Sequence, residues 1–438
     1  MTHRSPVFED LLEQPVAVLG AGLSGRAAAE ALERRGYAVV IYDRDSGRGT
    51  VDDFSPKAAA EHRLCIVSPG FAEDHPWLVT ARKQGCVIRS ELWLGRQFWK
   101  GKIIGVTGTN GKTTLTRLLA HAFSVAGFDA QAVGNVGLPL CAIVDDSKNH
   151  ADSIAVCEIS SFQAESSQEL HLNGLIWTNF AEDHLDRYAS MEAYFAAKAW
   201  LFESLVFEAP VIAGESVFAF ADEAKINLPI SVERAPKIAR ACLPPAFRLG
   251  PRGETFHQGA ALWQALGLSL EHWREAASSF QFDRHRLEFC GEQEGVRFWN
   301  DSKATNFHAC LAAVDGIEGP IFWIGGGRSK GGDLDGFAEQ LSSDISAAYI
   351  VCADPEAISR SFTPFMTTKD YDQLDSAVND AYLDAMHCGG GDVLFSPAFS
   401  SLDQYDSFAD RGDAFVDAVR RLDFEPTHRF FTQTLHLI

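Results

Sequence analysis

The chain lacks the features that would place it outside a reducing, aqueous compartment. Its nine cysteines are scattered singly and no CxxC pair occurs, so the sequence supports neither a zinc knuckle nor a disulfide framework. The N-terminal segment MTHRSPVFEDLLEQP contains no apolar core of signal-peptide length, and no later apolar run approaches the length of a membrane span. These absences predict a cytoplasmic protein without membrane insertion.

Positive charge is also scarce. The chain carries 38 Lys and Arg residues against 59 Asp and Glu residues, which gives a formal net charge of −21. Such a charge argues against nucleic acid or an anionic membrane surface as a general partner. An acidic protein that handles anionic substrates must concentrate its few cations locally. Lysines and arginines beside glycine-rich turns are therefore the informative ones.

Strand and helix patterns alternate along the whole chain of 438 residues. The apolar segments PVAVLG, KIIGVTG and PIFWIGGG each run into a glycine-rich turn. Alternation on this scale predicts an α/β protein with parallel sheets and helices on both faces of each sheet. A chain of this length is expected to form two or three domains. We place them at residues 1–98, 99–283 and 284–438.

The first glycine turn is a GxGxxG motif from Gly20 to Gly25, between a strand and a helix, with Asp43 at the end of the next strand. Taken alone, this arrangement predicts a dinucleotide-binding oxidoreductase. However, the glycines allow backbone N–H groups to approach any diphosphate, including that of a UDP-sugar. Ser68-Pro69-Gly70 follows another short strand and is expected at the same end of the sheet. A tight turn without a ligand is the third alternative.

The second glycine turn, Gly108-Thr109-Asn110-Gly111-Lys112-Thr113-Thr114, is the stronger signal. Its backbone donors can surround phosphate oxygens, Lys112 can neutralise the β- and γ-phosphates, and Thr113 can ligate Mg²⁺. The spacing is not a strict Walker A motif, because Val106 stands where the first glycine would be. The order of strand, turn and helix nevertheless predicts an ATP-binding P-loop.

Polar residues after later strands are candidate metal ligands. Glu158 follows a predicted strand and can bind Mg²⁺ directly or through water. His184 lies in the polar run NFAEDHLD, where a surface or capping role is the alternative. Lys198 lies in the apolar helix MEAYFAAKAWLFESLVF, where a surface lysine is the default interpretation. A partly buried lysine could instead become chemically modified.

Eight short motifs follow one another in a fixed order: GTNGKTT, GNVG, EISSFQ, NFAEDHLDRY, AAK, HRLE, NDSKATN and SPAFSSLDQY. Their set resembles the Mur ligase family from about Val16 to Val419. The resemblance implies a Rossmann-like UDP-binding domain, a P-loop ATPase-like central domain and a Rossmann-like C-terminal domain. It further implies an ATP-dependent ligase of peptidoglycan precursor synthesis that adds D-glutamate to UDP-N-acetylmuramoyl-L-alanine through an acyl phosphate.

The resemblance also implies roles for individual residues. Contacts with the UDP-substrate are assigned to Leu23, Ser24, Asp43, Arg44, Ser68, Pro69, Gly70 and Asn135. ATP is assigned to the seven P-loop residues, Gly108, Thr109, Asn110, Gly111, Lys112, Thr113 and Thr114, together with Arg286 and Asp301. Two Mg²⁺ sites are assigned to Thr113 and Glu158 and to His184 and Lys198, with Lys198 carbamylated. The catalytic residues are Lys112, His184, Lys198 and Lys303. The amino-acid substrate is assigned to Thr305, Lys330, Ser401 and Phe408.

Three departures from the family pattern are visible. Phe256-His257-Gln258-Gly259-Ala260-Ala261 stands where an HN-x-x-N motif for adenine is usual, the stretch from Glu208 to Phe256 is short, and residues 424–438 extend past the expected last helix. The alternatives are a ligase for another amino acid such as L-glutamate, a folate ligase, and a degenerate nucleotide-binding homologue. A UDP-type first domain disfavours the folate ligase. We expect a monomer.

Overall fold

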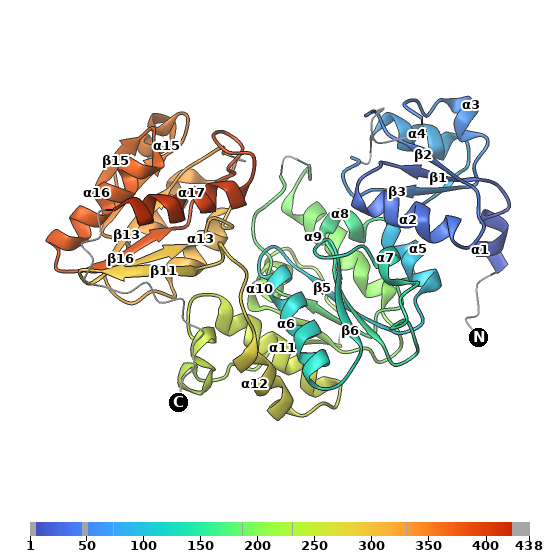
Figure 1. Cartoon of the computed structure of the whole chain (residues 1–438), viewed down its shortest axis with the longest axis horizontal. Coiled ribbons are helices and arrows are strands. Elements are labelled where there is room, and N and C mark those ends of the chain that lie inside the picture. The colour runs from blue at the N-terminus through green and yellow to red at the C-terminus, as the bar shows by residue number, and fades with distance from the viewer. Residues whose placement is uncertain are drawn as a thin grey trace. The chain divides into compact units, whose positions relative to one another are not determined.

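The computed structural model describes residues 6–45, 51–72, 74–185, 187–229, 231–329 and 331–422 (Figure 1). In these ranges the chain forms three sheets. It divides into two compact units. The first unit comprises Met1–Phe180, Arg187–Lys237 and Thr255–Phe280, and the second comprises Ala181–Asp186, Ile238–Glu254 and Gln281–Ile438. The predicted fold class, α/β with three domains built on parallel sheets, is confirmed, whereas the two boundaries between the predicted domains stay predictions.

The first sheet has four parallel strands in the order β2-β1-β3-β4. Its strands are β1 (Val16–Leu19), β2 (Val39–Tyr42), β3 (Leu64–Val67) and β4 (Val87–Ser90), and its helices are α1 (Pro6–Leu11), α2 (Leu23–Glu33), α3 (Pro56–Ala59), α4 (Pro76–Lys83) and α5 (Glu91–Phe98). The turn from β1 to α2 requires its last glycine, because a Cβ atom on Gly25 would lie 1.9 Å from the carbonyl oxygen of Gly20. The GxGxxG motif thus has a local packing reason, whatever ligand it holds.

The second sheet has six parallel strands in the order β10-β9-β8-β5-β7-β6. Its strands are β5 (Lys102–Thr107), β6 (Ala130–Gly134), β7 (Ile154–Glu158), β8 (Gly174–Trp177), β9 (Val211–Ala213) and β10 (Val232–Arg234). Its helices are α6 (Lys112–Val125), α7 (Leu140–Ile143), α8 (Ser161–Ala164), α9 (Met191–Ala199), α10 (Glu215–Glu223) and α12 (Leu270–Ser279), with the 3-10 turn η1 (Trp200–Ser204). The central strands β7 and β8 are buried throughout, which explains their continuous apolar sequence.

The first two sheets share one hydrophobic core. A single cluster of buried side chains contains Val18 and Leu32 from the first sheet and its helix, and Ile103, Val133 and Leu140 from the second. Side-chain hydrogen bonds add to this packing, since the hydroxyls of Ser90 and Ser167 lie 2.7 Å apart. The shared core accounts for the inclusion of both sheets in one compact unit.

The third sheet has the order β11-β12-β16-β13-β14-β15, and β11 is its antiparallel edge strand. Its strands are β11 (Glu288–Gln293), β12 (Val296–Asn300), β13 (Ile321–Gly325), β14 (Ala347–Val351), β15 (Thr368–Tyr371) and β16 (Gly391–Phe395), and its helices are α13 (Phe307–Val314), α14 (Leu334–Ser342), α15 (Pro355–Phe362), α16 (Leu374–His387) and α17 (Phe408–Arg421). The preceding segment contains η2 (Arg240–Cys242), η3 (Pro245–Phe247) and the start of α11 (Arg252–Ala265). The chain passes from β12 to β13, β14 and β15 in one direction across the sheet and then returns to β16, which lies between β12 and β13. The strand order therefore reverses at β16, and α/β proteins commonly bind ligands at the carboxyl ends of strands beside such a reversal.

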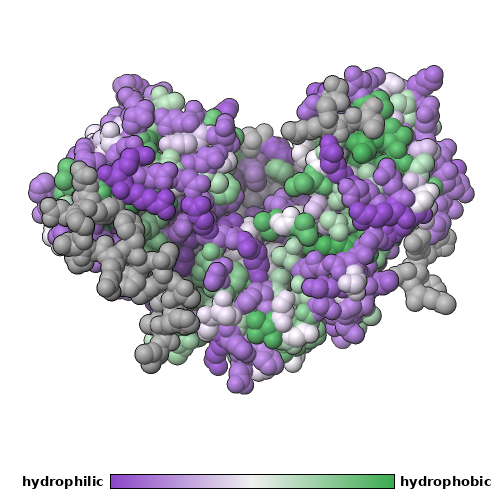
Figure 2. All heavy atoms as spheres, in the orientation of Figure 1, coloured by the Kyte–Doolittle hydropathy of each residue, from purple (hydrophilic) through white to green (hydrophobic). Residues whose placement is uncertain are grey.

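On the face shown in Figure 2, hydrophilic residues predominate and hydrophobic residues are scattered among them. Among the helices of the described ranges, none combines the length and the apolar character that a membrane crossing requires.

Candidate active site

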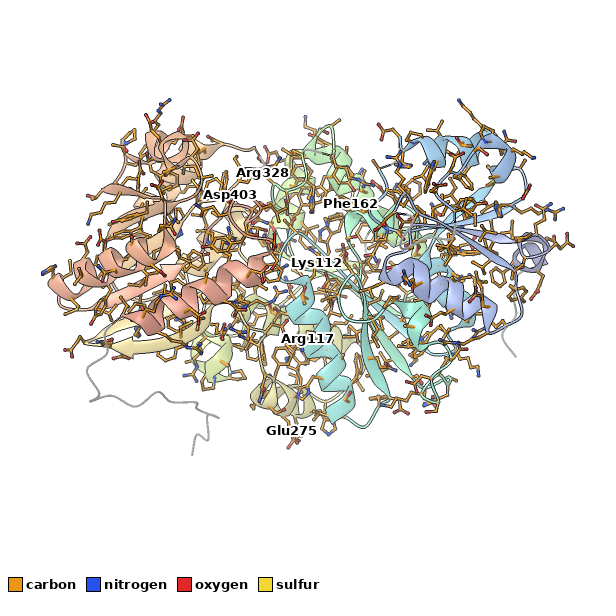
Figure 3. All side chains as sticks on the ribbon, turned by 45° about the horizontal axis from the view of Figure 1, so that its top comes forward. Lys112, Arg117, Phe162, Glu275, Arg328 and Asp403 are labelled. Carbon is orange, nitrogen blue, oxygen red and sulfur yellow. The ribbon has the colours of Figure 1, made fainter. Side chains whose placement is uncertain are left out.

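The P-loop lies between β5 and α6 and depends on glycine backbone conformations. Gly108 and Gly111 have φ values of +139° and +78°, and a Cβ atom on Gly108 would lie 2.0 Å from Oγ1 of Thr178. Lys112, at the first turn of α6, donates from Nζ to the carbonyl oxygens of Gly108 (3.0 Å) and Thr109 (2.7 Å). A lysine ammonium group and the N-terminus of a helix therefore meet at one loop, which is the arrangement that binds phosphate. Figure 3 shows Lys112 at the start of α6 and Arg117 further along the helix.

The loop that follows β8 fixes the conformation of the P-loop. Oγ1 of Thr178 donates to the carbonyl oxygen of Asn110 (2.6 Å), and the backbone N–H of Asn110 donates to Oδ1 of Asn179 (2.8 Å). The backbone N–H of Thr109 donates to the carbonyl oxygen of Asn179 (3.1 Å). Sequence analysis missed Thr178, which directly precedes the polar run NFAEDHLD, and assigned no role to Asn179, the first residue of that run.

Glu158 ends β7 beside the P-loop strand, at the register position of Val106. Its side chain is buried, with 2% of its surface exposed, and Oε1 accepts a hydrogen bond from Nδ2 of Asn135 (2.9 Å). Oε2 is also buried and has no hydrogen-bond partner among the described residues. A buried carboxylate oxygen without a donor is unfavourable unless a cation binds it, and Mg²⁺ prefers such oxygen ligands. Glu158 therefore fits its predicted metal role, while Asn135, predicted to contact the UDP-substrate, holds the Glu158 carboxylate.

Lys198 is buried, with 2% of its surface exposed, so its interpretation as a surface lysine is wrong. Its Nζ donates to the carbonyl oxygen of Gly108 (2.8 Å) and lies 4.6 Å from the centre of the Tyr194 ring. Lys198 thus contacts the same P-loop carbonyl as Lys112. The sequence signal for its burial was the apolar character of the whole helix. Tyr194, whose hydroxyl lies 3.4 Å from Oγ1 of Thr109, was missed.

His184 belongs to the second unit, whereas Lys198 belongs to the first. His184 has a φ of +58°, its backbone N–H donates to Oδ1 of Asp183 (2.9 Å), and its ring is partly exposed. In the described part of the chain, no group of three or more His, Cys, Asp and Glu side chains is arranged to hold a metal. A site that combines one carboxylate with a threonine, a modified lysine and phosphate oxygens would not form such a group. The pairing of His184 with Lys198 at a metal stays a prediction.

Except for Asn135, which follows β6 of the second sheet, the residues predicted for the UDP-substrate lie near the carboxyl end of the first sheet. Asp43 accepts a hydrogen bond at Oδ2 from the backbone N–H of Ala21 (2.7 Å), and Oγ of Ser68 donates to the carbonyl oxygen of Gly20 (3.3 Å). These bonds fix the glycine turn against the two neighbouring loops. Leu23 is exposed at the start of α2, and the guanidinium of Arg44 lies 5.9 Å from the Trp77 ring centre. Ser24 and Pro69 line a small crevice together with Glu91 and Gln163.

Asp301 and Lys303 follow the carboxyl end of β12. Asp301 accepts hydrogen bonds from the backbone N–H of Leu287 and from Oγ of Ser396, both at 3.0 Å. Burial raises the pKa of Asp301 to about 7, although these hydrogen bonds and the charges of Arg286 and Arg252 act in the opposite direction. Nζ of Lys303 lies 3.8 Å from the centre of the Phe408 ring, so a residue predicted for ATP contacts one predicted for the amino acid.

A cavity of about 290 Å³ in the second unit contains one of the predicted amino-acid contacts. Thr305 lines this cavity together with His184, Gly331 and Phe399. Ser401 is buried and follows Phe399 by two residues in the sequence. Lys330 lies outside the described residues. The cavity supports Thr305 as a contact and leaves the roles of the other three as predictions.

Arg411 is a buried residue that sequence analysis missed. Its guanidinium donates to the carbonyl oxygens of Ser302 and Phe399, each at 3.0 Å, and to Oγ of Ser302 (3.1 Å). Burial lowers the pKa of Arg411 to about 10. It ties the turn after β12 to the turn after β16. The only signal was an arginine within the pattern of buried positions in α17.

The substitution in the expected adenine motif also has a structural role. Gln258 lies in α11, is buried, and donates from Nε2 to the carbonyl oxygen of Thr178 (2.6 Å). It therefore supports the residue that holds the P-loop carbonyl of Asn110.

Comparisons with known proteins agree with this architecture. Residues 106–229 match the Mur ligase middle domain, residues 285–399 match the Mur ligase glutamate ligase domain, and residues 18–57 match an NAD(P)-binding Rossmann-like domain. A protein of Acidobacterium capsulatum is 33% identical over 94% of this chain and 97% of its own length, and one of Solibacter usitatus is 34% identical over 93% and 97%. Both relatives are named UDP-N-acetylmuramoylalanine–D-glutamate ligase.

Solved structures with lower identity share the fold. A pseudomurein peptide ligase type C of Methanothermus fervidus is 14% identical with a TM-score of 0.56, over 93% of this chain and 100% of its own. The UDP-N-acetylmuramate–alanine ligase of Thermotoga maritima is 17% identical with a TM-score of 0.53, over 93% and 99%. With relatives above 30% identity that match over nearly the whole length, and with a P-loop beside a buried carboxylate, the chain belongs to the Mur ligase family.

Proposed function

We propose that this chain joins D-glutamate to UDP-N-acetylmuramoyl-L-alanine in the cytoplasm, with ATP and Mg²⁺, as a step of peptidoglycan precursor synthesis. The observation that carries the proposal is the buried Oε2 of Glu158, which has no hydrogen-bond partner in the described part of the chain and lies on the strand next to that of the P-loop and its lysine. The names of the relatives support the choice of substrates. Family membership also sets aside the oxidoreductase that the first glycine turn allowed.

The first chemical step brings two anions together. The alanine carboxylate of the UDP-substrate attacks the γ-phosphorus of ATP, which gives an acyl phosphate and ADP. Positive charge must therefore lie at the phosphates, and Lys112 and the backbone N–H groups of the P-loop provide it. Mg²⁺, held by Glu158 and Thr113, would supply further positive charge. The family resemblance assigns Arg286, Asp301 and Lys303 to ATP as well.

In the second step, the amine of glutamate attacks the acyl carbon and phosphate leaves. Thr305, Ser401, Phe408 and Lys330 are proposed to hold the amino acid. Lys330 would offer a cation to a carboxylate, and Ser401 a hydroxyl. The decisive assay is ADP release with UDP-N-acetylmuramoyl-L-alanine, in which D- and L-glutamate are compared and each substrate is omitted in turn. D-Glutamate dependence supports the proposal, L-glutamate dependence indicates the alternative ligase, and no ADP release indicates a degenerate homologue.

We also propose that Lys198 loses a proton and that its neutral amine attacks the carbon of CO₂. The resulting carbamic acid loses a second proton and becomes an anionic oxygen ligand. The buried position of Lys198 beside the P-loop supports this role. Lys198→Ala should be inactive, and a small carboxylic acid should partly restore ADP release. Mass spectrometry of the peptide that contains Lys198 should show one added carboxyl group. Full activity of Lys198→Ala would refute the carbamate.

A further inference from the structure

The loop after β8 contacts two different parts of the first unit. At its start, Thr178 and Asn179 hold the P-loop. Near its end, Nη1 of Arg187 donates to the carbonyl oxygen of Phe71 (3.3 Å). Phe71 directly follows Ser68-Pro69-Gly70, and residues 68–71 are called here the SPGF loop. One connection of the second sheet therefore joins the P-loop to the loop of the first sheet that is assigned to the UDP-substrate.

Two contacts on the second sheet's side fix the Arg187 side chain. Nη2 donates to Oε2 of Glu165 (3.1 Å), and the guanidinium carbon lies 4.0 Å from the centre of the Phe162 ring. Phe162 belongs to the segment that starts at Glu158, and in Figure 3 it lies between Lys112 and the first sheet. Because the guanidinium group is planar and has several donors, it can hold a carboxylate and a carbonyl at the same time. Arg187 therefore links the SPGF loop to Phe162 in α8 and to Glu165 directly after it.

We infer that Arg187 is a positioning residue that sets the SPGF loop for the UDP-substrate. This inference rests on the proposed function. Without Arg187 the Phe71 carbonyl loses the donor that joins the SPGF loop to the second sheet, and Gly70 has open space around its Cα into which the loop can move. The loop is then held by contacts within the first sheet domain, such as that of Ser68 with Gly20. The cost falls on binding of the UDP-substrate. The P-loop keeps its own contacts with Thr178 and Asn179, so binding of ATP is unaffected.

Arg35 provides a matched control within the same chain. Like Arg187, its side chain is 20% exposed and its guanidinium carbon lies 4.0 Å from a phenylalanine ring centre, that of Phe98. It pairs with Asp145 (2.7 Å), which follows α7, and it donates to the carbonyl oxygen of Ala31 (2.8 Å). Arg35 thus connects the same two sheet domains. However, Arg35 lies beyond the C-terminal end of α2, whereas the glycine turn precedes the N-terminal end. The helix has 11 residues, each of which adds about 1.5 Å, so Arg35 lies a whole helix length from the turn.

The test measures kcat and KM by ADP release for the full-length wild type, Arg187→Ala, Arg187→Lys and Arg35→Ala, with thermal unfolding alongside. We expect Arg187→Ala to raise KM for UDP-N-acetylmuramoyl-L-alanine roughly tenfold, near the low end for a charged hydrogen bond because the side chain is partly exposed. KM for ATP should stay within about twofold, a change too small to reflect a lost charged hydrogen bond. Arg187→Lys, which keeps the charge but lacks the fork, should be intermediate and serves if Arg187→Ala does not fold.

Arg35→Ala should lower the unfolding temperature without the selective rise in KM for the UDP-substrate. Equal rises in Arg187→Ala and Arg35→Ala would mean that any lost contact between the two sheet domains has this effect, and would overturn the inference. A parallel rise of all three KM values in the Arg187 variants would overturn it as well. A wild type that releases no ADP with any substrate pair is a different result, because it contradicts the proposed function itself.

Discussion

Replacement of Glu158 by glutamine tests the metal role through stability as well as activity. The substitution keeps the shape of the side chain and its hydrogen bond from Asn135, but it removes the negative charge of the carboxylate. In the described part of the chain, Oε2 of this carboxylate is buried and has no hydrogen-bond partner. Leaving a buried polar group unsatisfied costs about 1–3 kcal/mol, and more for a charged group. The new amide keeps part of this cost because its N–H group is also unpartnered. Glu158→Gln should therefore stabilise the metal-free protein by about 1–2 kcal/mol.

The expected shift is measurable by thermal unfolding. A change of 1 kcal/mol moves the midpoint by about 2–4 °C for a domain of 150–250 residues, so Glu158→Gln should raise the midpoint without Mg²⁺ by roughly 2–8 °C. With Mg²⁺ and a non-hydrolysable ATP analogue the order should reverse. Ligand at about 100 times its Kd stabilises a protein by about 2.7 kcal/mol, and the variant should lose most of this gain together with ADP release.

A second buried carboxylate serves as the control for this experiment. Glu91 is 3% exposed, close to the 2% of Glu158, but its Oε1 accepts a hydrogen bond from the backbone N–H of Cys141 (2.5 Å). Glu91→Gln should keep the full stabilisation by Mg²⁺ and nucleotide, because Glu91 is not assigned to the metal. If Glu158→Gln destabilised the metal-free protein and kept the ligand-dependent shift, the assignment of Glu158 to Mg²⁺ would be refuted.

Two further predictions concern the P-loop lysine and the pH dependence of stability. Lys112→Ala should abolish ADP formation, whereas calorimetry should find binding of the UDP-substrate within about twofold of wild type, because Lys112 lies on the carbonyls of Gly108 and Thr109 in the loop proposed for ATP. Wild-type turnover would reject the assignment. Burial raises the pKa of Glu91 to about 7, so the folded state binds this proton more tightly than the unfolded state, and the associated stability is lost as pH rises from about 4.5 to about 7. Glu91→Gln should remove this dependence. Between pH 5 and 7.5, its free energy of unfolding should therefore rise by about 2–3 kcal/mol relative to that of the wild type. If the two free energies changed in parallel across this range, the prediction would be wrong.

The segments that form the two glycine turns could be predicted because their signals are local. An apolar strand that runs into Gly108 or Gly20 leaves few conformations for the turn, and both glycines have a positive φ. The helix of Lys198 is instructive in another way. Apolar residues flank the lysine in the sequence, which indicates burial, yet the residue type alone favoured exposure.

Contacts between distant segments could not be predicted in the same way. Thr178 and Asn179 hold the P-loop because β8 pairs with β5, and nothing in the P-loop sequence identifies that neighbour. Similarly, Arg411 reaches the turns after β12 and β16 only because α17 packs beside them. The shared core of the first two sheets also depends on which helices pack together. Strand patterns along the chain do not determine this.

The P-loop contains an electrostatic conflict that relates its structure to its chemistry. Nζ of Lys112 and Nζ of Lys198 lie 3.0 Å and 2.8 Å from the same oxygen, the carbonyl of Gly108, so the two nitrogens are at most about 6 Å apart. Two ammonium groups at this separation repel each other, and the carbonyl dipoles of Gly108 and Thr109 offset part of that repulsion. An anionic triphosphate would relieve it, and so would conversion of Lys198 into a carbamate. In a protein with a net charge of −21, two lysines on one carbonyl are the local concentration of cations that an anionic substrate requires.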